Sequence, residues 1–378
     1  MKRILLVTTS YPDVGEGKAA AGVFVRDFAR ALATAGVAVE VIAAASIAGQ
    51  REDEGVTESR FAVPRQPLSL LRPTHIQDWP AIFSTLTQGR QAVLAACARN
   101  RPDHILALWA LPSGAWAQHA ARHFGIGYST WALGSDIWSL GKIPLLRQYL
   151  GRVMRHAQHR FADGFQLSED VKAICGRQCE FLASSRDFGV PSSRTVSAAP
   201  PYRLAFLGRW HANKGIDLLL DALESMNEQD WAKIAAVKLH GGGPLEVQVR
   251  ERARALHRSG KPVEVGGYLD LEGARELFGW TDYVLIPSRI ESIPVVFSDA
   301  MQARRPVIAT PVGDLPQLLQ GTQGACGVLA ADTTAQSIAV AICRALQTSP
   351  AHFSPQLCAM AQTFDCTISA RTLAAKVL

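Results

Sequence analysis

The sequence contains no hydrophobic run that approaches the roughly 20 residues a helix needs to cross a membrane. It also contains no Cys-x-x-Cys pair. Its seven cysteines are scattered, and the nearest two, Cys175 and Cys179, have no histidine at zinc-ligand spacing. These absences argue against a transmembrane protein, a disulfide scaffold and a structural zinc site, and they favour a cytoplasmic protein. Because the apolar run from Ile4 to Val7 is followed by Thr-Thr-Ser, we expect a first strand there and not a signal peptide.

A strong excess of charge is also missing. Lys and Arg number 39 and Asp and Glu 33, a net charge of +6, which is too mild to predict a nucleic-acid partner. Hydrophobic residues make up 48% of the chain, as in globular proteins. The 378 residues exceed the roughly 250–300 that one core supports, so we expect two domains.

The first half of the chain follows a strand–loop–helix–strand pattern. Residues 3–9 are almost wholly apolar, Phe24, Phe28 and Leu32 recur at helical spacing, and residues 37–43 resemble a second strand. Further strand-like runs occupy residues 104–108 and 127–132. Alternating strands and helices of this kind predict a parallel sheet.

The same pattern restarts after a segment rich in Ser and Pro, residues 184–201, which suits a linker. The expected strands are residues 203–207, 233–239, 263–266, 283–287 and 307–310, and a helix is expected over 216–223. The sequence therefore predicts an α/β fold of two Rossmann-like, doubly wound domains facing each other across a cleft. The expected ranges are a first domain 1–185, a linker 186–202, a second domain 203–349, and a helical segment 350–378 that packs back on the first domain.

Two cations stand in a short loop after a strand of the second half. Arg209 and Lys214 lie between Gly208 and Gly215, which allow close backbone approach. Arg can bind a diphosphate bidentately and Lys adds a point charge. Taken alone, the loop is equally consistent with a solvated surface turn.

A second group of polar residues lies around Pro294, which we expect to be the first residue of a helix. The backbone N–H groups of Ser292, Ile293 and the following residues would then form an anion site. Glu291 precedes this helix and Asp299 lies within it. Either carboxylate alone fits a capping or solvated residue, but together with the two cations they favour a bound diphosphate ester.

Two features of the first half carry less weight. The Gly-x-Gly-x-x-Ala pattern over residues 15–20 is separated from its strand by seven residues, which argues against a dinucleotide fingerprint. Asp136 directly follows a predicted strand and fits either a polar site residue or an Asx-turn or helix cap.

The chain resembles the retaining glycosyltransferases of family 4, which have the two-domain GT-B fold. The resemblance rests on AGVFVRDFARALATAGVAVEVI, ALGSDI, LAFLGRWHANKGIDLLLDAL, LHGGGP, the pair Glu291 and Asp299, and RRPVIATPVGD. It implies a nucleotide-sugar site in the second domain, an acceptor site in the first, and no metal or other cofactor, because cations and helix dipoles stabilise the leaving group.

The resemblance also assigns roles to individual residues. Arg209 and Lys214 would bind the donor diphosphate, Glu291 the donor sugar, and Asp299 the ribose. Further donor contacts would come from Gly22, Gly208, Ser292, Ile293, and the base-binding residues Gly267 and Tyr268. The sequence departs from the family in two places: Asp299 is shorter than the usual Glu, and Leu133 replaces a histidine that contacts the sugar. Asp136 is then the polar candidate of the first domain, as a base or orienter for the acceptor.

Residues 137–162 contain no acidic residue and five cations: Lys142, Arg147, Arg152, Arg155 and Arg160. Apolar residues recur among them at helical spacing. Both a peripheral helix on an anionic membrane, over residues 142–160, and a core helix with a basic outer face fit this pattern.

The expected activity is therefore a metal-independent, retaining, hexosyltransferase-like reaction. It would use a UDP- or GDP-sugar and a glycan or lipid-linked acceptor, in cell-envelope or exopolysaccharide synthesis. Two alternatives stay open: a related GT-B enzyme such as an epimerase or phosphorylase, and a catalytically silent partner that binds nucleotide sugars.

Overall fold

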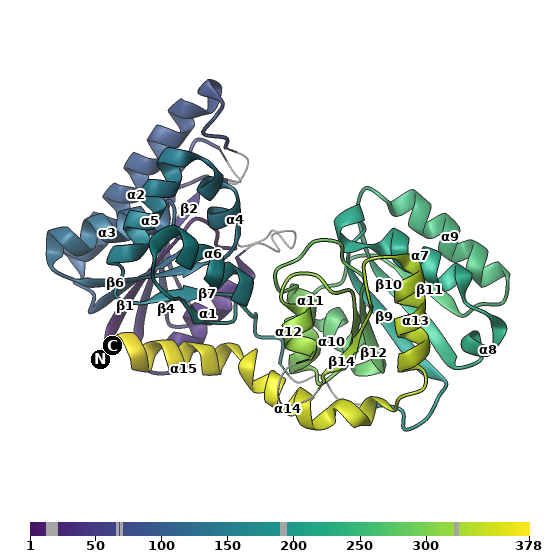
Figure 1. The fold of residues 1–378 in the computed structure, drawn as a ribbon. Coiled ribbons are helices and arrows are strands. Elements are labelled where there is room, and N and C mark those ends of the chain that lie inside the picture. The colour runs from purple at the N-terminus through teal and green to yellow at the C-terminus, as the bar shows by residue number, and fades with distance from the viewer. Residues whose placement is uncertain (13–21, 66–67, 69–70, 190–194, 321–324) are drawn as a thin grey trace. The chain divides into compact units, whose positions relative to one another are not determined.

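The computed structural model describes residues 1–12, 22–65, 68, 71–189, 195–320 and 325–378, and the chain forms two compact units (Figure 1). Unit 1 comprises Met1–Asp187 and Cys366–Leu378, and unit 2 comprises Phe188–Asp365. The boundary between Asp187 and Phe188 falls within the predicted linker, and the last helix belongs to unit 1.

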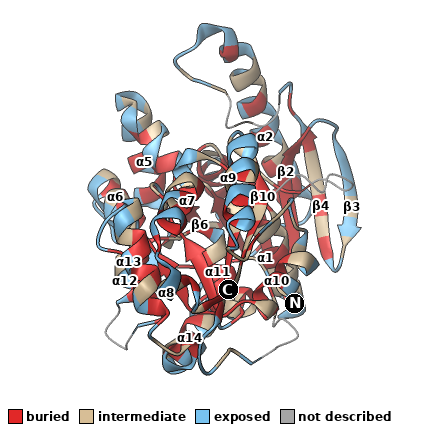
Figure 2. Ribbon diagram, turned by 90° about the vertical axis from the view of Figure 1, so that its right-hand side faces the viewer, coloured by how far each residue is buried: buried red, intermediate tan, exposed pale blue. Residues whose placement is uncertain are grey.

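Unit 1 is built on an eight-stranded sheet with the order β3-β4-β2-β1-β5-β6-β7-β8. Its strands are β1 (Arg3–Thr8), β2 (Ala38–Ala45), β3 (Gly49–Asp53), β4 (Val56–Ala62), β5 (His104–Leu108), β6 (Gly127–Ala132), β7 (Arg160–Ala162) and β8 (Glu180–Phe181). Every pairing is parallel except that of the edge strand β3 with β4. Figure 2 shows the contrast between the exposed β3 and the buried β2.

Helices cover both faces of this sheet because successive side chains of a strand point to opposite sides. Leu5 and Val7 pack with α2, α3, α5 and α6, whereas Ile4 and Leu6 pack with α1 and α15. The helices of unit 1 are α1 (Val23–Thr34), α2 (Trp79–Arg99), α3 (Ser113–Phe124), α4 (Ser135–Trp138), α5 (Pro144–His156), α6 (Phe165–Cys175) and α15 (Cys366–Val377).

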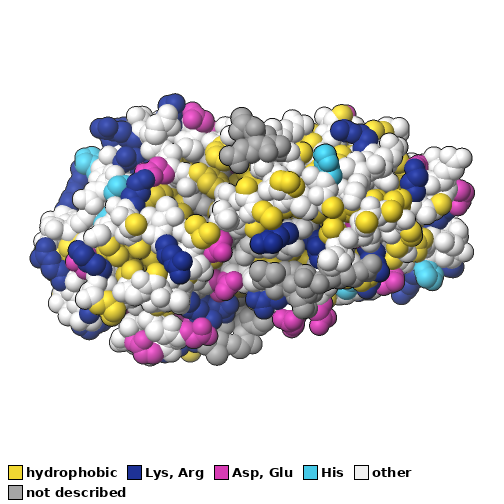
Figure 3. All heavy atoms as spheres, turned by 90° about the horizontal axis from the view of Figure 1, so that it is seen from below, with side chains coloured by type: hydrophobic (Ala, Val, Ile, Leu, Met, Phe, Trp, Pro, Cys, Tyr) yellow, Lys and Arg dark blue, Asp and Glu magenta, His cyan; other side chains and the backbone are white. Residues whose placement is uncertain are grey.

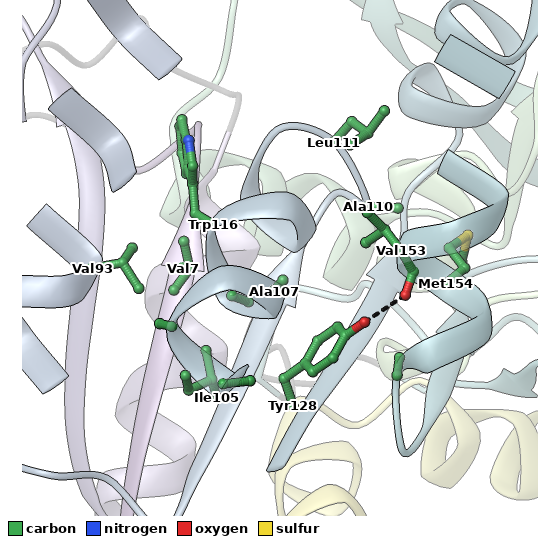
Figure 4. Packing of buried hydrophobic residues seen from close by; sticks show 14 of the residues in the cluster. Val7, Val93, Ile105, Ala107, Ala110, Leu111, Trp116, Tyr128, Val153 and Met154 are labelled. Carbon is green, nitrogen blue, oxygen red and sulfur yellow. Dashed lines mark hydrogen bonds between the residues drawn. The ribbon is translucent and has the colours of Figure 1, made fainter. Parts of the chain in front are cut away.

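Figure 4 shows the first of these two cores, where polar groups at the helix layer are paired. The Tyr128 hydroxyl donates to the backbone carbonyl of Val153 on α5 at 2.6 Å, and it accepts from Gln118 on α3 at 3.0 Å. The indole N–H of Trp116 donates to the carbonyl of Leu86 on α2 at 3.0 Å. These bonds tie α2, α3 and α5 to one another and to the sheet beneath them.

Unit 2 has a fully parallel six-stranded sheet with the order β11-β10-β9-β12-β13-β14. Helices α9, α7 and α13 pack side by side, and Figure 1 shows α10, α11 and α12 on the other side of the strands. The strands are β9 (Tyr202–Arg209), β10 (Ile234–Gly242), β11 (Val263–Gly266), β12 (Tyr283–Ile286), β13 (Val307–Ala309) and β14 (Gly327–Leu329). The helices are α7 (Ile216–Ser225), α8 (Glu228–Trp231), α9 (Glu246–Arg258), α10 (Leu271–Trp280), α11 (Val295–Gln302), α12 (Leu315–Leu319), α13 (Ala335–Ala345) and α14 (Ser354–Thr363).

The predicted fold class, two parallel-sheet α/β domains, is confirmed. Strands β5, β6 and β11 have the predicted bounds, and β1, β2, β9, β10, β12 and β13 differ from them by a few residues at one or both ends. The helix at Pro294 is a correction: α11 begins at Val295, because Pro294 has an extended backbone with ψ of 139°. Within the described ranges, no helix is both long and apolar enough to cross a membrane.

One buried histidine couples the folding of unit 1 to pH. His104 opens β5, is 1% exposed, and lies 2.8 Å from the hydroxyl of Ser129 on β6. Burial lowers the pKa of His104 to about 4, with a smaller contribution from the nearby His159. The folded protein therefore holds His104 neutral at a pH where the unfolded chain binds a proton.

We expect His104 to make wild-type stability fall as the pH falls from 6.5 towards 4. The unfolded state takes up a proton in this range and the folded state does not, which removes about 2 kcal/mol between pH 7.5 and pH 5. Denaturant unfolding at both pH values checks this. His104→Gln is expected to be destabilising at pH 7.5 and to lose less stability on acidification than wild type. Equal losses in the two proteins would contradict the assignment.

Candidate functional site

The polar residues predicted in the second half gather at the carboxyl edge of the six-stranded sheet of unit 2. Arg209 is the last residue of β9 and is exposed, and Lys214 ends a 3₁₀ turn, Ala212–Lys214, directly after it. Glu291 lies in the loop between β12 and α11. Because β9 and β12 are neighbours in the sheet, their two loops meet.

Lys214 and Glu291 form an ion pair across these loops. The Lys214 ammonium donates to Glu291 Oε1, and the Ser288 hydroxyl donates to the same oxygen at 3.1 Å. The Glu291 side chain is 12% exposed and that of Lys214 38% exposed. Two residues that the sequence analysis assigned to one ligand are therefore in direct contact, with the cation on the more accessible side.

Arg289 clamps the two loops together. Its backbone N–H donates to the carbonyl of Asn213 at 2.8 Å, and its guanidinium donates to the carbonyl of Ala212 at 2.6 Å. The same guanidinium binds both carboxylate oxygens of Asp217 on α7, at 2.8 and 2.7 Å. Burial raises the pKa of Asp217, but the Arg289 hydrogen bonds and charge outweigh it and lower that pKa overall. Arg289 was not predicted from the sequence as a site residue, although it lies two residues before Glu291.

Two glycines allow the Glu291 segment to be held on both sides. Gly215 has φ of +68°, and a Cβ atom there would lie 1.8 Å from the carbonyl oxygen of Pro287. Gly313 has φ of +53°, and a Cβ atom there would lie 2.3 Å from the carbonyl oxygen of Glu291. The N–H of Asp314 also donates to the carbonyl of Ser292 at 3.2 Å. No side chain larger than hydrogen fits at either glycine without moving this segment.

The polar groups predicted around the start of α11 are present, but their positions differ from those expected. Ser292 and Ile293 lie in the loop before the helix and are partly buried, and the Ser292 hydroxyl has no hydrogen-bond partner among the described residues. Asp299 is on the second turn of α11 and is 1% exposed. A ribose can reach this carboxylate only if neighbouring side chains move, whereas the Glu291 side chain is partly exposed.

The predicted base-binding residues lie at the end of β11. Tyr268 is 71% exposed, and its hydroxyl donates to the carbonyl of Gly242 at the end of β10 at 2.7 Å. A Cβ atom at Gly242 would lie 2.6 Å from the Tyr268 ring, whereas one at Gly267 would meet nothing within 4 Å. Gly208 precedes Arg209 on β9. The exposed ring of Tyr268 therefore lies beside the loop that follows β9, because Gly242 also accepts from the backbone N–H of Trp210.

In unit 1, Asp136 is a buried carboxylate that organises its own turn. It is 2% exposed and accepts from the backbone N–H of Ala110 at 2.5 Å and that of Leu133 at 3.4 Å. Burial raises the pKa of Asp136 to about 6, although these hydrogen bonds act to lower it. Both contacts join the segments that follow β5 and β6. Neither contact caps α4, whose N-cap residue Gly134 has no side-chain cap hydrogen bond.

Gly22 caps α1 with φ of +93°, and a Cβ atom there would lie 2.9 Å from the backbone of Ser10 and Tyr11. Residues 13–21, which include Gly15 and Gly17, lie outside the described residues. Within the described part of the chain, no group of three or more His, Cys, Asp or Glu side chains is placed to hold a metal ion.

Comparison with known proteins identifies this architecture. The family described as Glycosyl transferases group 1 matches residues 201–348. The chain is 28% identical over 262 residues to a Bacillus subtilis protein named as a teichuronic acid biosynthesis glycosyltransferase, TuaC, covering 64% of this chain and 61% of that protein. It is 31% identical over 157 residues to the D-inositol 3-phosphate glycosyltransferase of Corynebacterium diphtheriae, covering 41% and 35%. These matches span less than two thirds of each relative's length.

Solved structures share the fold along the whole chain. The Anabaena protein HepE in complex with UDP aligns with a TM-score of 0.68 and 17% identity, covering 100% of this chain and 99% of that one. Sucrose-phosphate synthase from Thermosynechococcus elongatus aligns with a TM-score of 0.70 and 18% identity, covering 100% and 98%. The chain has the GT-B fold, and residues 201–348 match the model of the group 1 glycosyl transferases. The predicted resemblance is confirmed at this level, while membership of family 4 stays a prediction.

We expect Gly313→Ala to destabilise unit 2 more than the matched change Gly260→Ala. Both positions have positive φ, so each alanine adds about 1–2 kcal/mol of backbone strain. A Cβ atom at Gly260 meets nothing within 4 Å, whereas one at Gly313 collides with the Glu291 backbone, which adds about 1–3 kcal/mol. Denaturant unfolding of both variants measures the difference. Equal destabilisation would show that the Glu291 segment moves aside freely.

Proposed function

We propose that the protein is a retaining, metal-independent glycosyltransferase of the hexosyltransferase type. It would move a sugar from a UDP- or GDP-sugar to a glycan or lipid-linked acceptor, as a cytoplasmic or peripheral membrane protein in cell-envelope or exopolysaccharide synthesis. The observation that carries the proposal is the juxtaposition of Arg209, Lys214 and the rigidly held Glu291 at one sheet edge. The relative named for teichuronic acid biosynthesis supports an envelope acceptor, and the UDP-bound neighbour supports the donor.

The proposed roles follow from charge and position. Arg209 and Lys214 offer cations to a diphosphate, and Lys214 can turn from Glu291 to the phosphate because its side chain is the more exposed of the pair. Glu291 then accepts hydrogen bonds from sugar hydroxyls. Ser292 and Ile293 would add backbone contacts at the start of α11, and the exposed Tyr268 ring would contact the base.

In the proposed reaction, the acceptor hydroxyl oxygen forms a bond to the anomeric carbon on the face from which the diphosphate departs. The bond between that carbon and the diphosphate oxygen breaks, and its electron pair stays with the phosphate. The hydroxyl proton passes to the departing phosphate oxygen. Arg209 and Lys214 lower the barrier by stabilising the negative charge that develops there.

The role of Asp136 is more limited in this proposal. Its carboxylate is buried and holds the backbone N–H groups of Ala110 and Leu133. We therefore propose that Asp136 positions the turns after β5 and β6, in preference to acting as a base on the acceptor.

A nucleotide that occupies this site should stabilise the protein against heat. Ligand at one hundred times its dissociation constant adds about 2.7 kcal/mol, which is several degrees for a domain of this size. We expect a shift with UDP or GDP and the matching sugar nucleotide, unchanged by EDTA. Arg209→Ala should abolish the shift, and Arg254→Ala, which removes another exposed arginine of unit 2, should keep it. The proposed site is wrong if Arg209→Ala keeps the full shift.

The stereochemistry of the product tests the reaction itself. Attack on the same face predicts that the new glycosidic bond keeps the anomeric configuration of the donor, which NMR of the product reads directly. An inverted product would contradict the mechanism. Donor binding without turnover on any acceptor extract would instead favour a silent nucleotide-sugar-binding partner, a reading that the buried Asp299 also favours.

A further inference from the structure

Positive charge is concentrated in one part of unit 1. Residues 63–162 contain eleven Lys and Arg residues but three Asp and Glu residues, a net charge of +8, although the whole chain carries +6. The rest of the chain is therefore slightly acidic. Helices α2, α3 and α5 all belong to this segment, and α3 contacts both of the others. Lys and Arg side chains are visible along the left of Figure 3, where unit 1 lies.

The three acidic residues of this segment do not offset the charge at its surface. Asp78 is 8% exposed and binds Arg65 at 2.9 Å, and Asp136 is 2% exposed. Asp103 precedes β5, at the amino edge of the sheet, where it accepts from the backbone N–H of Arg3 at 2.7 Å. Since the helices α2 and α5 lead back to the amino ends of β5 and β7, their own N-terminal ends lie towards the opposite, carboxyl edge.

Large apolar side chains are exposed at those N-terminal ends. In and just before α2, Ile76 is 73% exposed, Trp79 46%, Phe83 62% and Leu86 39%. The rings of Trp79 and Phe83 meet edge to face with their centroids 6.4 Å apart, within the roughly 4.5–7 Å typical of such pairs. Figures 1 and 2 show this end of α2 projecting from unit 1. We call residues Ile76, Trp79, Phe83 and Leu86 the α2 tip.

Helix α5 combines exposed apolar side chains with positive charge. Leu145 is 77% exposed and Tyr149 43%, and Arg147 and Arg152 are exposed beside them. The neighbouring α6 carries Glu169 and Asp170, but Glu169 binds Lys172 and Asp170 accepts from the Trp138 indole. Apolar residues flanked by unopposed arginines are the pattern of a protein surface that lies on anionic lipid.

We propose that the α2 tip and α5 together form a docking surface for an anionic membrane. The apolar side chains of the α2 tip and Leu145 enter the boundary between headgroups and acyl chains. Lys142 and the arginines of α5 contact the lipid phosphates. Trp79 suits this position because its indole N–H is already bonded to the carbonyl of Pro73, which leaves the ring apolar. The proposal adds the α2 tip to the basic helix that the sequence indicated over residues 142–160. The sequence pattern of the α2 tip did not indicate a membrane-binding role.

Vesicle flotation tests the proposal without donor or acceptor, so it does not depend on the proposed reaction. Wild type should bind vesicles that contain about one third phosphatidylglycerol, and should bind phosphatidylcholine vesicles at least about tenfold more weakly. Binding should fall as salt is raised, because the Debye length shortens. Equal binding to both vesicle types, or none to either, would overturn the proposal.

Double substitutions test the contributions of the α2 tip and of α5 separately. Ile76→Ser with Phe83→Ser should weaken binding to anionic vesicles by about tenfold or more, because the apolar burial is lost. The control Val247→Ser with Val340→Ser removes exposed apolar residues of unit 2 and should leave binding unchanged. Circular dichroism and thermal unfolding confirm that each variant is folded, as expected for exposed positions.

The charge is tested in the same assay. Arg147→Gln with Arg152→Gln should weaken binding by about 25-fold, at roughly fivefold per cation. Arg254→Gln with Arg258→Gln, on α9 of unit 2, is the matched control. A tip variant that binds like wild type would overturn the proposal. So would a dimer, detected by sedimentation without lipid, that the tip variant abolishes, because the tip would then serve a second copy of the chain.

Discussion

The arrangement of unit 2 depends on three loops, after β9, β12 and β13, whose backbones approach too closely for a side chain to fit between them. Gly215 faces the carbonyl of Pro287, and Gly313 faces the carbonyl of Glu291. With these contacts in place, Lys214 and Glu291 have fixed partners and Arg289 can reach two carbonyls and a carboxylate at once. A flexible loop would lose conformational freedom when it closed on a charged ligand, whereas this one is already ordered by packing.

Most of the strands and helices could be predicted from the sequence because short-range patterns of apolar residues determine them. Buried parallel strands such as β5 and β6 are continuous apolar runs, and their bounds could be read directly. Strands β3 and β4 were missed because they are polar: VTESRFA places Glu58 at a fully buried position, where Arg51 and Arg60 neutralise it. An ion pair between residues of neighbouring strands leaves no recognisable pattern in the sequence of either strand.

The candidate site was predicted in its residues but not in its contacts. The types and order of Arg209, Lys214 and Glu291 indicated an anion site, yet nothing in the spacing showed that Lys214 and Glu291 pair or that Asp299 is buried. The role of Arg289 could not be predicted from the sequence because its partner Asp217 lies 72 residues away. Asp136 was ambiguous in the sequence, and only the backbone N–H groups around it show which contacts it makes. Burial and long-range pairing are properties of the folded chain, which a sequence pattern does not record.

Helix α15 gives the molecule an order of assembly that differs from the order of its sequence. Cys366, Ala370 and Leu373 complete the core beneath α1, and the Lys376 ammonium binds Glu180 on β8. Unit 1 therefore consists of two segments, one before unit 2 in the sequence and one after it. The ribosome synthesises every residue of unit 2 before it synthesises α15. Until then, the core that contains Phe28 and Leu32 of α1 is only partly covered, so the unit begun first is the one completed last.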